Sequence, residues 1–319
     1  MTVVVLPGDG IGPEVMREAL RALERVAPDL ELEEHAFGAQ AIRATGDSLP
    51  EETLAACKGS EAVLKGPIGD PEFDAAEVRP EQGMLRLRAE LDVYANLRPS
   101  EQGRVDILIV RELVGGLYFG ERGVREDGTV YDTMEYHPRQ VERIARRAFE
   151  LARGRRKRVV SVDKANVLET SRMWRRVVTE VAAGYDDVAL DHMLVDNAAM
   201  QLVLATDQFD VLVTENMFGD ILSDLAASLT GGIGLAPSAS LSDDGPGLFE
   251  PVHGSAPDIA GKGVANPMAM MLSTALMLEH GLGRADDAEH LRTAVWTTHE
   301  TGGELHTADF GDAVVRALS

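Results

Sequence analysis

The most informative segment of the chain is Asn216-Met217-Phe218-Gly219-Asp220-Ile221-Leu222-Ser223-Asp224-Leu225-Ala226-Ala227-Ser228. The apolar spacing after Gly219 predicts a helix, and residues four apart on a helix share one face. Asp220 and Asp224 therefore point the same way, which costs a helix about 0.2–0.5 kcal/mol unless something offsets the repulsion. Mg²⁺ or Mn²⁺ would offset it, because both ions favour carboxylate oxygen. The alternative is that Asp220 caps the helix and Asp224 is solvated.

The composition is that of a globular protein with a large core. Of 319 residues, 45% are hydrophobic and 26% are charged, and this length suggests two domains or one large α/β unit. Cys57 is the only cysteine, so an internal disulfide is excluded and a reducing cytoplasm is expected. The N-terminus lacks the pattern of a signal peptide, and no apolar run reaches the roughly 18–20 residues that span a bilayer.

The net charge of −22 restricts the partners of the protein. A surface this acidic repels nucleic acid and anionic lipid, so neither nucleic acid nor a membrane is expected as a partner. An anionic substrate would have to be drawn in by a local cluster of arginines, against the overall field.

Strand-like apolar runs alternate with helical patterns along the chain. The expected strands are residues 3–6, 62–64, 106–110, 159–162, 188–192 and 211–214, and the expected helices include residues 14–27, 139–153, 171–183 and 268–280. This alternation predicts an α/β fold with a largely parallel sheet. Residues 241–247 are expected to form a loop, and a peripheral helix with a short tail is expected after Gly283.

The first glycine-rich turn is Gly8-Asp9-Gly10-Ile11-Gly12-Pro13, directly after the first strand. Glycines at a strand–helix junction permit a tight turn onto a helix N-terminus, as in dinucleotide-binding folds. The third glycine of the Gly-x-Gly-x-x-Gly pattern is missing, however, and no acidic residue can be placed about 20 residues further on. A plain strand–turn–helix junction is therefore the alternative.

Three arginines are candidates for binding carboxylates. Guanidinium groups bind carboxylates in bidentate fashion, so Arg88, Arg98 and Arg111 together could hold a dicarboxylate. Arg111 is the best placed, because it ends the 106–110 strand and ligands of α/β sheets bind at strand carboxyl ends. Each arginine could instead form a surface ion pair.

Other polar residues lie where strands end or glycines cluster. Tyr118 follows Gly115-Gly116 and could donate a proton, or it could be a packed aromatic. Lys164 follows the 159–162 strand and could act as a base, or pair with Asp163. Asp196 begins an apolar helix, where N-capping is the alternative to metal binding.

The loop of residues 250–267 is unusually dense in glycine and polar residues, and such loops are often functional. Within it, Asp258 would suit the diol of a ribose and would repel a 2′-phosphate.

Together, the 250–267 loop and the 216–228 helix resemble the β-decarboxylating hydroxyacid dehydrogenases, the family of isocitrate and isopropylmalate dehydrogenases. The resemblance runs from Leu6 to about Glu279, with all motifs in order. It implies two open α/β domains with a mostly parallel sheet and an NAD site that is not of the ordinary Rossmann type. The implied domains are residues 1–94 with 233–319, which bind the cofactor, and residues 95–232, which bind substrate and metal and form the dimer.

The resemblance also implies roles for individual residues. Arg88, Arg98 and Arg111 would grip the carboxylates of a malate, with Asp196 also near the substrate. Asp196, Asp220 and Asp224 would hold one Mg²⁺ or Mn²⁺ per subunit. Lys164 would be the base and Tyr118 the proton donor to the enolate carbon. Lys164 and Asp196 would enter the site from the neighbouring subunit of a homodimer.

The NAD-binding parts implied by the resemblance are residues 68–81 and 254–266. His253 would lie beside the adenine and Asp258 on the adenosine ribose, which favours NAD over NADP. The cofactor-binding set implied in this way is Ile68, Glu81, Asn166, His253, Gly254, Ser255, Ala256, Asp258 and Asn266.

Members of this family differ in the group on the third carbon of the malate. Glu81, Gln82, Met84 and Leu85 would line that pocket, and the apolar Met84 and Leu85 could receive an isopropyl group. A carboxylate would be poorly compensated there. The expected reaction is therefore NAD-dependent oxidative decarboxylation of 3-isopropylmalate to 4-methyl-2-oxopentanoate and CO₂, in leucine biosynthesis. The alternatives are homoisocitrate, isocitrate, tartrate or D-malate as substrate, and a non-catalytic regulatory relative.

Two segments depart from the family pattern. The segment between Arg98 and Arg111 is shorter than usual, and residues 70–78 are acidic and idiosyncratic.

Overall fold

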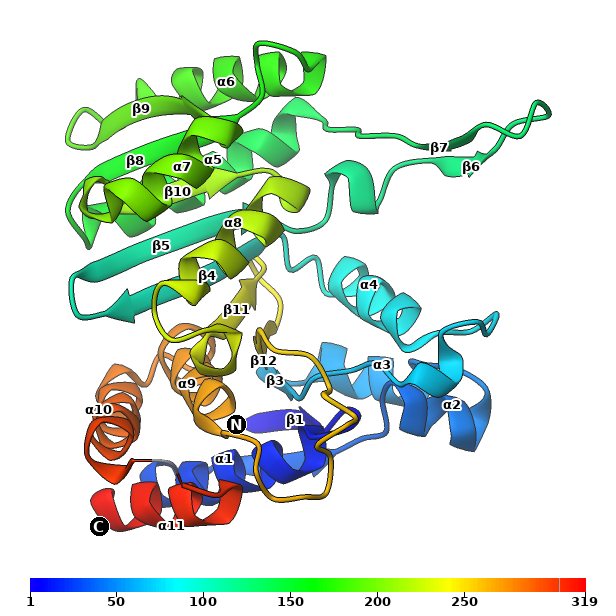
Figure 1. Cartoon of the computed structure of the whole chain (residues 1–319), viewed down its shortest axis with the longest axis vertical. Helices are drawn as coiled ribbons and strands as arrows, with labels where there is room; N and C mark the ends of the chain where they lie inside the picture. The colour runs from blue at the N-terminus through cyan, green and yellow to red at the C-terminus, as the bar shows by residue number, and fades with distance from the viewer. Residues whose placement is uncertain (304) are drawn as a thin grey trace. The chain divides into compact units, whose positions relative to one another are not determined.

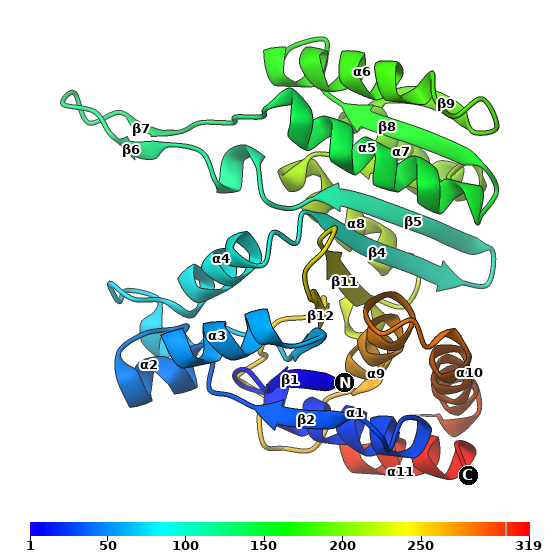
Figure 2. The ribbon, with the colours of Figure 1, turned by 180° about the vertical axis from the view of Figure 1, so that it is seen from behind.

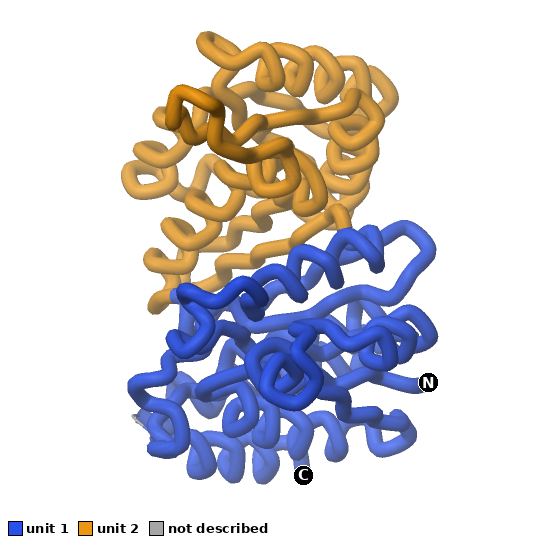
Figure 3. The backbone as a smooth tube through the Cα atoms, turned by 90° about the vertical axis from the view of Figure 1, so that its right-hand side faces the viewer, with its two compact units in different colours: residues 1–93, 233–319 blue, residues 94–232 orange. Residues whose placement is uncertain are grey.

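The computed structural model describes residues 1–303 and 305–319, and these divide into two compact units (Figure 3). The first unit is discontinuous and consists of Met1–Val93 and Ile233–Ser319, whereas the second is the continuous segment Tyr94–Gly232. Both units contain parallel strands and helices, so the predicted α/β class is confirmed.

In the first unit, the strand order is β2-β1-β3-β12-β11, and only β11 is antiparallel to its neighbour β12. β1 and β3 are apolar except for Thr2 at the start of β1 and Lys65 at the end of β3, because a parallel strand is covered on both faces. The elements of this unit are β1 (Thr2–Leu6), α1 (Gly12–Val26), β2 (Glu31–Glu34), α2 (Ala39–Thr45), α3 (Glu51–Gly59), β3 (Ala62–Lys65), η1 (Pro71–Phe73), α4 (Pro80–Glu90), η4 (Ile233–Leu235), β11 (Pro237–Leu241), β12 (Gly247–Pro251), α9 (Met268–Leu276), η5 (Met277–Gly281), α10 (Ala285–Gly302) and α11 (Thr307–Ala317).

In the second unit, the strand order is β4-β5-β10-β8-β9, and only β4 is antiparallel to its neighbour β5. The elements are β4 (Ala95–Gln102), β5 (Val105–Glu112), η2 (Gly116–Tyr118), β6 (Arg122–Val124), β7 (Val130–Asp132), α5 (Pro138–Arg153), β8 (Arg158–Asp163), α6 (Glu169–Ala182), β9 (Ala189–Leu194), α7 (Val195–Leu204), η3 (Thr206–Gln208), β10 (Val211–Thr214) and α8 (Asn216–Ser228).

Helices cover both faces of the sheet in the second unit. α5 and α6 lie on one face and α7 and α8 on the other, as the opposite views in Figures 1 and 2 show. Ile109, Val160 and Leu212 of the central strands are buried against Leu202 of α7 and Leu222 of α8. This packing fixes α8, with its two aspartates, on the sheet. The β6–β7 ribbon projects away from the sheet of this unit (Figure 1).

The short segment between Arg98 and Arg111 forms the β4–β5 hairpin. Its two strands pair from Ala95 opposite Glu112 to Gln102 opposite Val105, and Gly103 turns the chain with a φ of 60°. A positive φ at a tight turn suits glycine, which has no Cβ to clash. Shortening the segment therefore leaves a tight hairpin, and both arginines remain in strands.

The expected strands and helices are all present, with boundary shifts of a few residues. Two differences are larger. The apolar helix expected over residues 268–280 ends its α-helical part at Leu276 and continues as a π-turn, Met277–Gly281. The C-terminal region contains the two helices α10 and α11 where one helix and a tail were expected. Among the described residues, no helix is long and apolar enough to cross a membrane.

Candidate active site

Polar side chains gather at the carboxyl ends of the parallel strands in the second unit. Arg111 lies near the end of β5, Asp163 ends β8, and Glu215 directly follows β10. In α/β sheets this edge is where ligands bind. The position of Arg111 at such an edge, expected from the sequence, is therefore confirmed.

Glu215, and not Asp220, caps helix α8. The Glu215 carboxylate accepts hydrogen bonds from the backbone N–H of Met217 at 3.1 Å and of Phe218 at 2.6 Å. The helix thus begins one turn before Asp220, which leaves that carboxylate free of a capping duty. The capping alternative for Asp220 is wrong, because the buried Glu215 already satisfies the first N–H groups of the helix.

The Asp220 carboxylate interacts with both a guanidinium and a phenol hydroxyl. Arg111 Nη1 forms an ion pair with Asp220 Oδ1, and the Tyr118 hydroxyl donates to Asp220 Oδ2 at 3.0 Å. Gly219 makes this approach possible, because a Cβ at that position would lie 2.6 Å from Arg111 Cγ. Burial raises the pKa of Tyr118, and the neighbouring Asp220 raises it further, so the hydroxyl keeps its proton at neutral pH.

Asp224 lies one turn further along α8. Its Oδ1 is 4.0 Å from Arg98 Nη1. Burial raises the pKa of Asp224 and Arg98 lowers it, while Asp220 raises it again because the two carboxylates repel each other. The side chains of Asp220 and Asp224 are 38% and 56% exposed, so both carboxylates are open to a ligand from solution.

Lys164 and Asp196 form an ion pair with each other. Hydrogen bonding from Lys164 lowers the pKa of Asp196. The alternative pairing of Lys164 with Asp163 is not what the structure has, because Arg175 binds the buried Asp163 carboxylate at 2.8 and 2.9 Å. Asp196 does not join Asp220 and Asp224, since the described part of the chain brings no three His, Cys, Asp or Glu side chains together as metal ligands.

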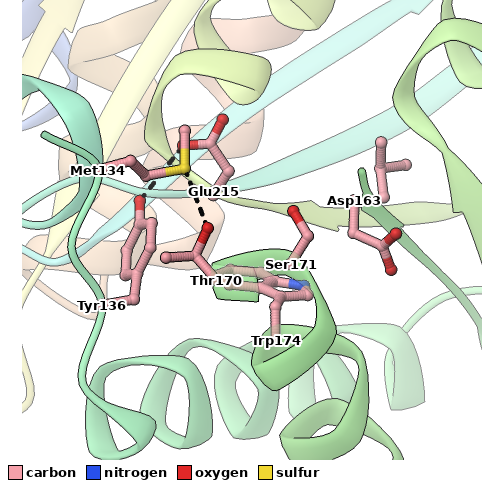
Figure 4. Close-up of a pocket in the computed structure, with 8 residues that line it drawn as sticks. Met134, Tyr136, Asp163, Thr170, Ser171, Trp174 and Glu215 are labelled. Carbon is pink, nitrogen blue, oxygen red and sulfur yellow. Dashed lines mark hydrogen bonds between the residues drawn. The ribbon is translucent and has the colours of Figure 1, made fainter. Parts of the chain in front are cut away.

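Two buried acids behind this region were not singled out from the sequence. Burial raises the pKa of Glu112 to about 7 and also raises that of Glu215. The Tyr136 hydroxyl lies 3.5 Å from Glu215 Oε2 and accepts the backbone N–H of Asn216 at 3.0 Å. Figure 4 shows Tyr136 directed at Glu215 in a small pocket that Trp174 also lines. The sequence signal was an acidic residue at the end of one apolar strand, Glu112 of β5, and another directly after a second, Glu215 after β10.

In the first unit, Arg88 belongs to a buried ionic triad. Arg88 Nη2 lies 3.0 Å from Glu250 Oε1, and Lys65 Nζ lies 2.8 Å from Glu250 Oε2. Burial alone would raise the pKa of Glu250, but Lys65 and Arg88 hold it down to about 2. The surface ion pair considered for Arg88 is therefore wrong, because its partner is a buried carboxylate. The sequence signal for Lys65 was a lysine that ends an otherwise apolar strand.

The predicted substrate-pocket residues lie on helix α4 and differ in their exposure to solvent. Glu81, Leu85 and Arg88 follow at the i, i+4 and i+7 positions, so they share one face of the helix. Met84 is 6% exposed and packs into the core of the unit, while Leu85 is only half-buried. The Gln82 side chain instead accepts the backbone N–H of Arg79 at 3.0 Å at the start of the helix.

The loop after β12 packs on the glycine-rich turn after β1. Ile11 N–H donates to Ser255 O at 2.8 Å, and a Cβ on Gly10 would lie 2.0 Å from the same oxygen. The Asp9 carboxylate fills the turn and accepts the N–H groups of Ala39 and Gly69 at 3.0 Å each. These contacts occupy the turn that binds pyrophosphate in an ordinary Rossmann fold.

Two features of this loop indicate a ligand surface. Ala256 has a φ of 41°, and non-glycine residues in this region are strained and cluster at functional sites. His253 Nδ1 lies 3.0 Å from Gly254 O, whereas its buried Nε2 has no hydrogen-bond partner. Burial lowers the pKa of His253, so the ring is neutral at pH 7.

The other predicted cofactor residues are variously exposed. Asn166, Gly254, Asp258 and Asn266 are exposed, Ile68 is half-buried and Ser255 is buried. The Asn266 side chain already has a structural task, because its Oδ1 accepts the N–H of Met268 at 3.0 Å at the start of α9.

The chain matches the family model described as isocitrate/isopropylmalate dehydrogenase over residues 2–318. It belongs to this family. Proteins named 3-isopropylmalate dehydrogenase from Zymomonas mobilis and Shouchella clausii are 51% and 52% identical to it, over 100% and 99% of this chain and 100% and 93% of theirs.

Solved structures of the family are similar over the whole chain. An isocitrate dehydrogenase from Methylococcus capsulatus superposes with a TM-score of 0.93 at 36% identity, covering 99% of both chains. A β-decarboxylating dehydrogenase from Thermococcus kodakarensis gives 0.87 at 40% identity, covering 99% of this chain and 96% of its own. The isocitrate/isopropylmalate dehydrogenase fold expected from the sequence is thus confirmed.

Proposed function

We propose that the protein catalyses the NAD-dependent oxidative decarboxylation of 3-isopropylmalate in leucine biosynthesis. The observation that carries this proposal is the identity of about half of all residues, over the full length, to relatives that bear the name of that enzyme. The solved isocitrate dehydrogenase is less similar in sequence, at 36% identity, which favours isopropylmalate over isocitrate as the substrate.

The reaction removes a hydride from C2 of the substrate to NAD⁺, and the C2 hydroxyl proton goes to a base. The bond from C3 to the β-carboxylate then breaks, CO₂ leaves, and its electron pair remains as an enolate. Protonation at C3 gives 4-methyl-2-oxopentanoate. Lys164 is the proposed base, and Tyr118 is the proposed donor to C3. The raised pKa of Tyr118 supports this role, since a phenol that keeps its proton can donate it.

The residues of the chain fit a divalent metal in part. Asp220 and Asp224 offer two solvent-accessible carboxylates on one helix face, which is the donor type that Mg²⁺ and Mn²⁺ prefer. We propose that Asp196 of a second copy completes the set. A bound cation would supply electrostatic stabilisation of the developing enolate oxygen. Arg98 and Arg111 beside these aspartates are proposed to bind the substrate carboxylates, and Arg88 is proposed to contribute from the first unit.

The residues of the first unit are proposed to bind NAD at the loop after β12. The buried, unpaired Nε2 of His253 supports a polar ligand such as adenine, and the filled glycine-rich turn supports a site of the non-Rossmann type. We also propose roles for Glu81 and Ile68, with Leu85 beside Arg88 on α4 receiving the isopropyl group. NAD⁺ would supply the hydride acceptor.

Replacing Asp258 by alanine is expected to narrow the preference for NAD over NADP by about 10-fold or more, because an exposed carboxylate that binds a ribose diol also repels a 2′-phosphate. The measurement is kcat/KM for both cofactors. Asp286→Ala, at an exposed acid on α10, is the control for a general charge effect. An unchanged ratio in Asp258→Ala would count against the ribose role.

A homodimer is proposed because the second unit exposes large apolar side chains on neighbouring elements of its surface. Val167, Met200, Val203, Leu204 and Ile221 are each at least 56% exposed, and they lie on α7, α8 and the loop after Lys164. Large apolar side chains exposed together mark protein–protein contacts, which supports a contact through α7 and α8. The ribbon residues Val124 and Val130 are also exposed and would extend the contact.

A mixing experiment tests whether the sites are shared. Lys164→Ala and Asp220→Asn are each expected to be inactive as homodimers. Subunits exchanged between them are expected to recover roughly a quarter of wild-type activity, because half of the dimers are hybrids and half of their sites keep both residues. Asp224→Asn mixed with Asp220→Asn is the control, since these residues share one chain. Recovery in the control, or none in the test, would contradict the shared site.

The function itself is tested by following NADH formation with Mg²⁺ or Mn²⁺. 3-Isopropylmalate, isocitrate, homoisocitrate, tartrate and D-malate are offered in parallel. A clear preference for 3-isopropylmalate is expected. Preference for another acid would overturn the substrate while keeping the mechanism, and turnover of none would revive a regulatory role.

A further inference from the structure

Arg98 and Arg111, the two arginines of the second unit that are proposed to bind substrate carboxylates, are each held by a buried asparagine. Arg98 Nε donates to Asn96 Oδ1 at 2.8 Å. Arg111 donates to Asn216 Oδ1 twice, from Nε at 3.0 Å and from Nη2 at 2.8 Å. Both asparagines are 0% exposed, so neither amide can turn to water instead.

The sheet register explains why these groups meet. Asn96 of β4 lies directly opposite Arg111 of β5, so the two side chains are on the same face. Arg98 is two residues beyond Asn96 and therefore also points to that face. Helix α8 packs against both strands and brings Asn216, its first residue, to Arg111.

The Asn216 amide is fixed by bonds at both ends. While its oxygen accepts from Arg111, its Nδ2 donates to Leu113 O at 3.1 Å and to Gly115 O at 3.0 Å. A flipped amide would set its NH₂ against the guanidinium and its oxygen against two carbonyls. Asn216 consequently ties Arg111 and the segment that leads to Tyr118 to the start of the helix that carries Asp220.

Each guanidinium therefore lies between a neutral amide and an aspartate. Arg111 has Asn216 on one side and Asp220 on the other, and Arg98 has Asn96 and, at 4.0 Å, Asp224. An amide orients a guanidinium through hydrogen bonds without cancelling its charge.

We propose that Asn96 and Asn216 are positioning residues, which set Arg98 and Arg111 in the orientation that binds the carboxylates of the substrate. The inference rests on the proposed function, because that function makes these arginines the carboxylate grip. It assigns the two amides an effect on substrate affinity beyond their contribution to folding.

The test compares Asn96→Leu and Asn216→Leu with the wild type. Leucine is similar in size but accepts no hydrogen bond, so the guanidinium loses its orientation. KM for 3-isopropylmalate is expected to rise about 10- to 100-fold, which is the change in affinity that the loss of charge-assisted hydrogen bonds produces. KM for NAD⁺ is expected to change less than about 3-fold in both variants, because neither amide is proposed to touch the cofactor. The change in kcat is expected to be equally small in Asn96→Leu, whereas Asn216→Leu also releases the segment that leads to Tyr118, so a fall in its kcat is compatible with the proposal.

Two further sets of variants separate positioning from folding. Asn96→Asp and Asn216→Asp keep an acceptor oxygen and are expected to give KM values between those of the wild type and the leucine variants. Thr230→Val, which removes the buried hydroxyl bond to Ala227 O just after α8, is the control and is expected to leave both KM values unchanged. If a leucine variant does not fold, the serine variant replaces it, since its hydroxyl is too short to reach the guanidinium.

An unchanged KM for the substrate in the leucine or serine variants would overturn the proposal. The proposal would also be overturned if KM for NAD⁺ rose while kcat and the thermal midpoint fell to a similar extent, because such changes indicate a structural role only. Wild-type protein that turns over no acid would refute the proposed function instead. The same ranking of variants is then read from calorimetric titration with malate, which requires no turnover.

Discussion

Asp220→Asn is expected to reduce metal-dependent turnover by about 10³-fold, because a metal ligand supplies several kcal/mol of stabilisation to the charge that develops in the transition state. The substitution keeps the size of the side chain and one acceptor oxygen for Tyr118 or Arg111. It removes the negative charge that a cation requires. The measurements are kcat at saturating Mn²⁺ and the affinity for Mn²⁺ by calorimetry, where a large loss is expected in both.

Folding is expected to survive this substitution. Arg111 loses an ionic partner, but Asn216 still accepts two of its hydrogen bonds, and the repulsion between Asp220 and Asp224 is relieved. Asp186→Asn, at an exposed turn of the same unit, is the matched control for loss of one charge and is expected to behave as the wild type. Activity without metal in Asp220→Asn, or unchanged Mn²⁺ affinity, would refute the assignment of Asp220 as a ligand.

The sequence predicted those parts of the fold that local pattern determines. Residues 159–162 and 211–214 are largely apolar and fully buried, with Ser161 and Thr214 as the exceptions in polarity, because their strands are parallel and covered on both faces. Arg111 and Lys164 could be assigned to the ligand edge, because they end or follow such strands. The i, i+4 spacing placed Asp220 and Asp224 on one helix face without reference to any tertiary contact.

Strand β4 could not be predicted in this way. Its sequence, Ala-Asn-Leu-Arg-Pro-Ser-Glu-Gln, is polar in alternate positions and contains Pro99, which cannot donate to a ladder. Pairing with β5, through a hairpin turned at Gly103, makes it a strand. Register is a tertiary property, so the placement of Asn96 opposite Arg111 was equally out of reach.

The other features that the sequence did not predict depend on which side chains pair in the folded chain. Glu215 takes the cap of α8 because its carboxylate reaches the N–H groups of Met217 and Phe218, and nothing in the sequence ranks it above Asp220 for that task. Lys65 and Glu250 come from strands that are far apart in the chain, and only the adjacency of β3 and β12 brings them together.

The ion pair between Lys65 and Glu250 is expected to have a large effect on the stability of the protein. Glu250→Gln is expected to lower the free energy of unfolding by about 3–5 kcal/mol, because it leaves the fully buried Lys65 without its counter-charge. The remaining hydrogen bond from Lys65 Nζ to Gly66 O, at 2.7 Å, does not supply a charge. Chemical denaturation at neutral pH measures the difference. Arg88 also loses its anchor, so KM for the substrate is expected to rise.

The double variant Lys65→Met with Glu250→Gln separates the pair from its surroundings. Removing both charges eliminates the uncompensated lysine, so the double variant is expected to regain most of the stability that Glu250→Gln loses. The affinity for substrate is not expected to return, since Arg88 still lacks the carboxylate. Lys65→Met alone completes the comparison. A loss of stability in the double variant equal to the sum of the losses in Glu250→Gln and Lys65→Met would show that Lys65 and Glu250 do not depend on each other.

The pH dependence provides an independent check, and its sign follows from the lowered pKa of Glu250. The folded state holds this pKa at about 2, against an ordinary value of 4.5, so the unfolded chain takes up the proton first as the pH falls. The contribution of Glu250 to stability is therefore complete above about pH 4.5 and is lost toward about pH 2. The difference in unfolding free energy between wild type and Glu250→Gln is expected to narrow over that interval. A constant difference would mean that the carboxylate is not held ionised by Lys65 and Arg88.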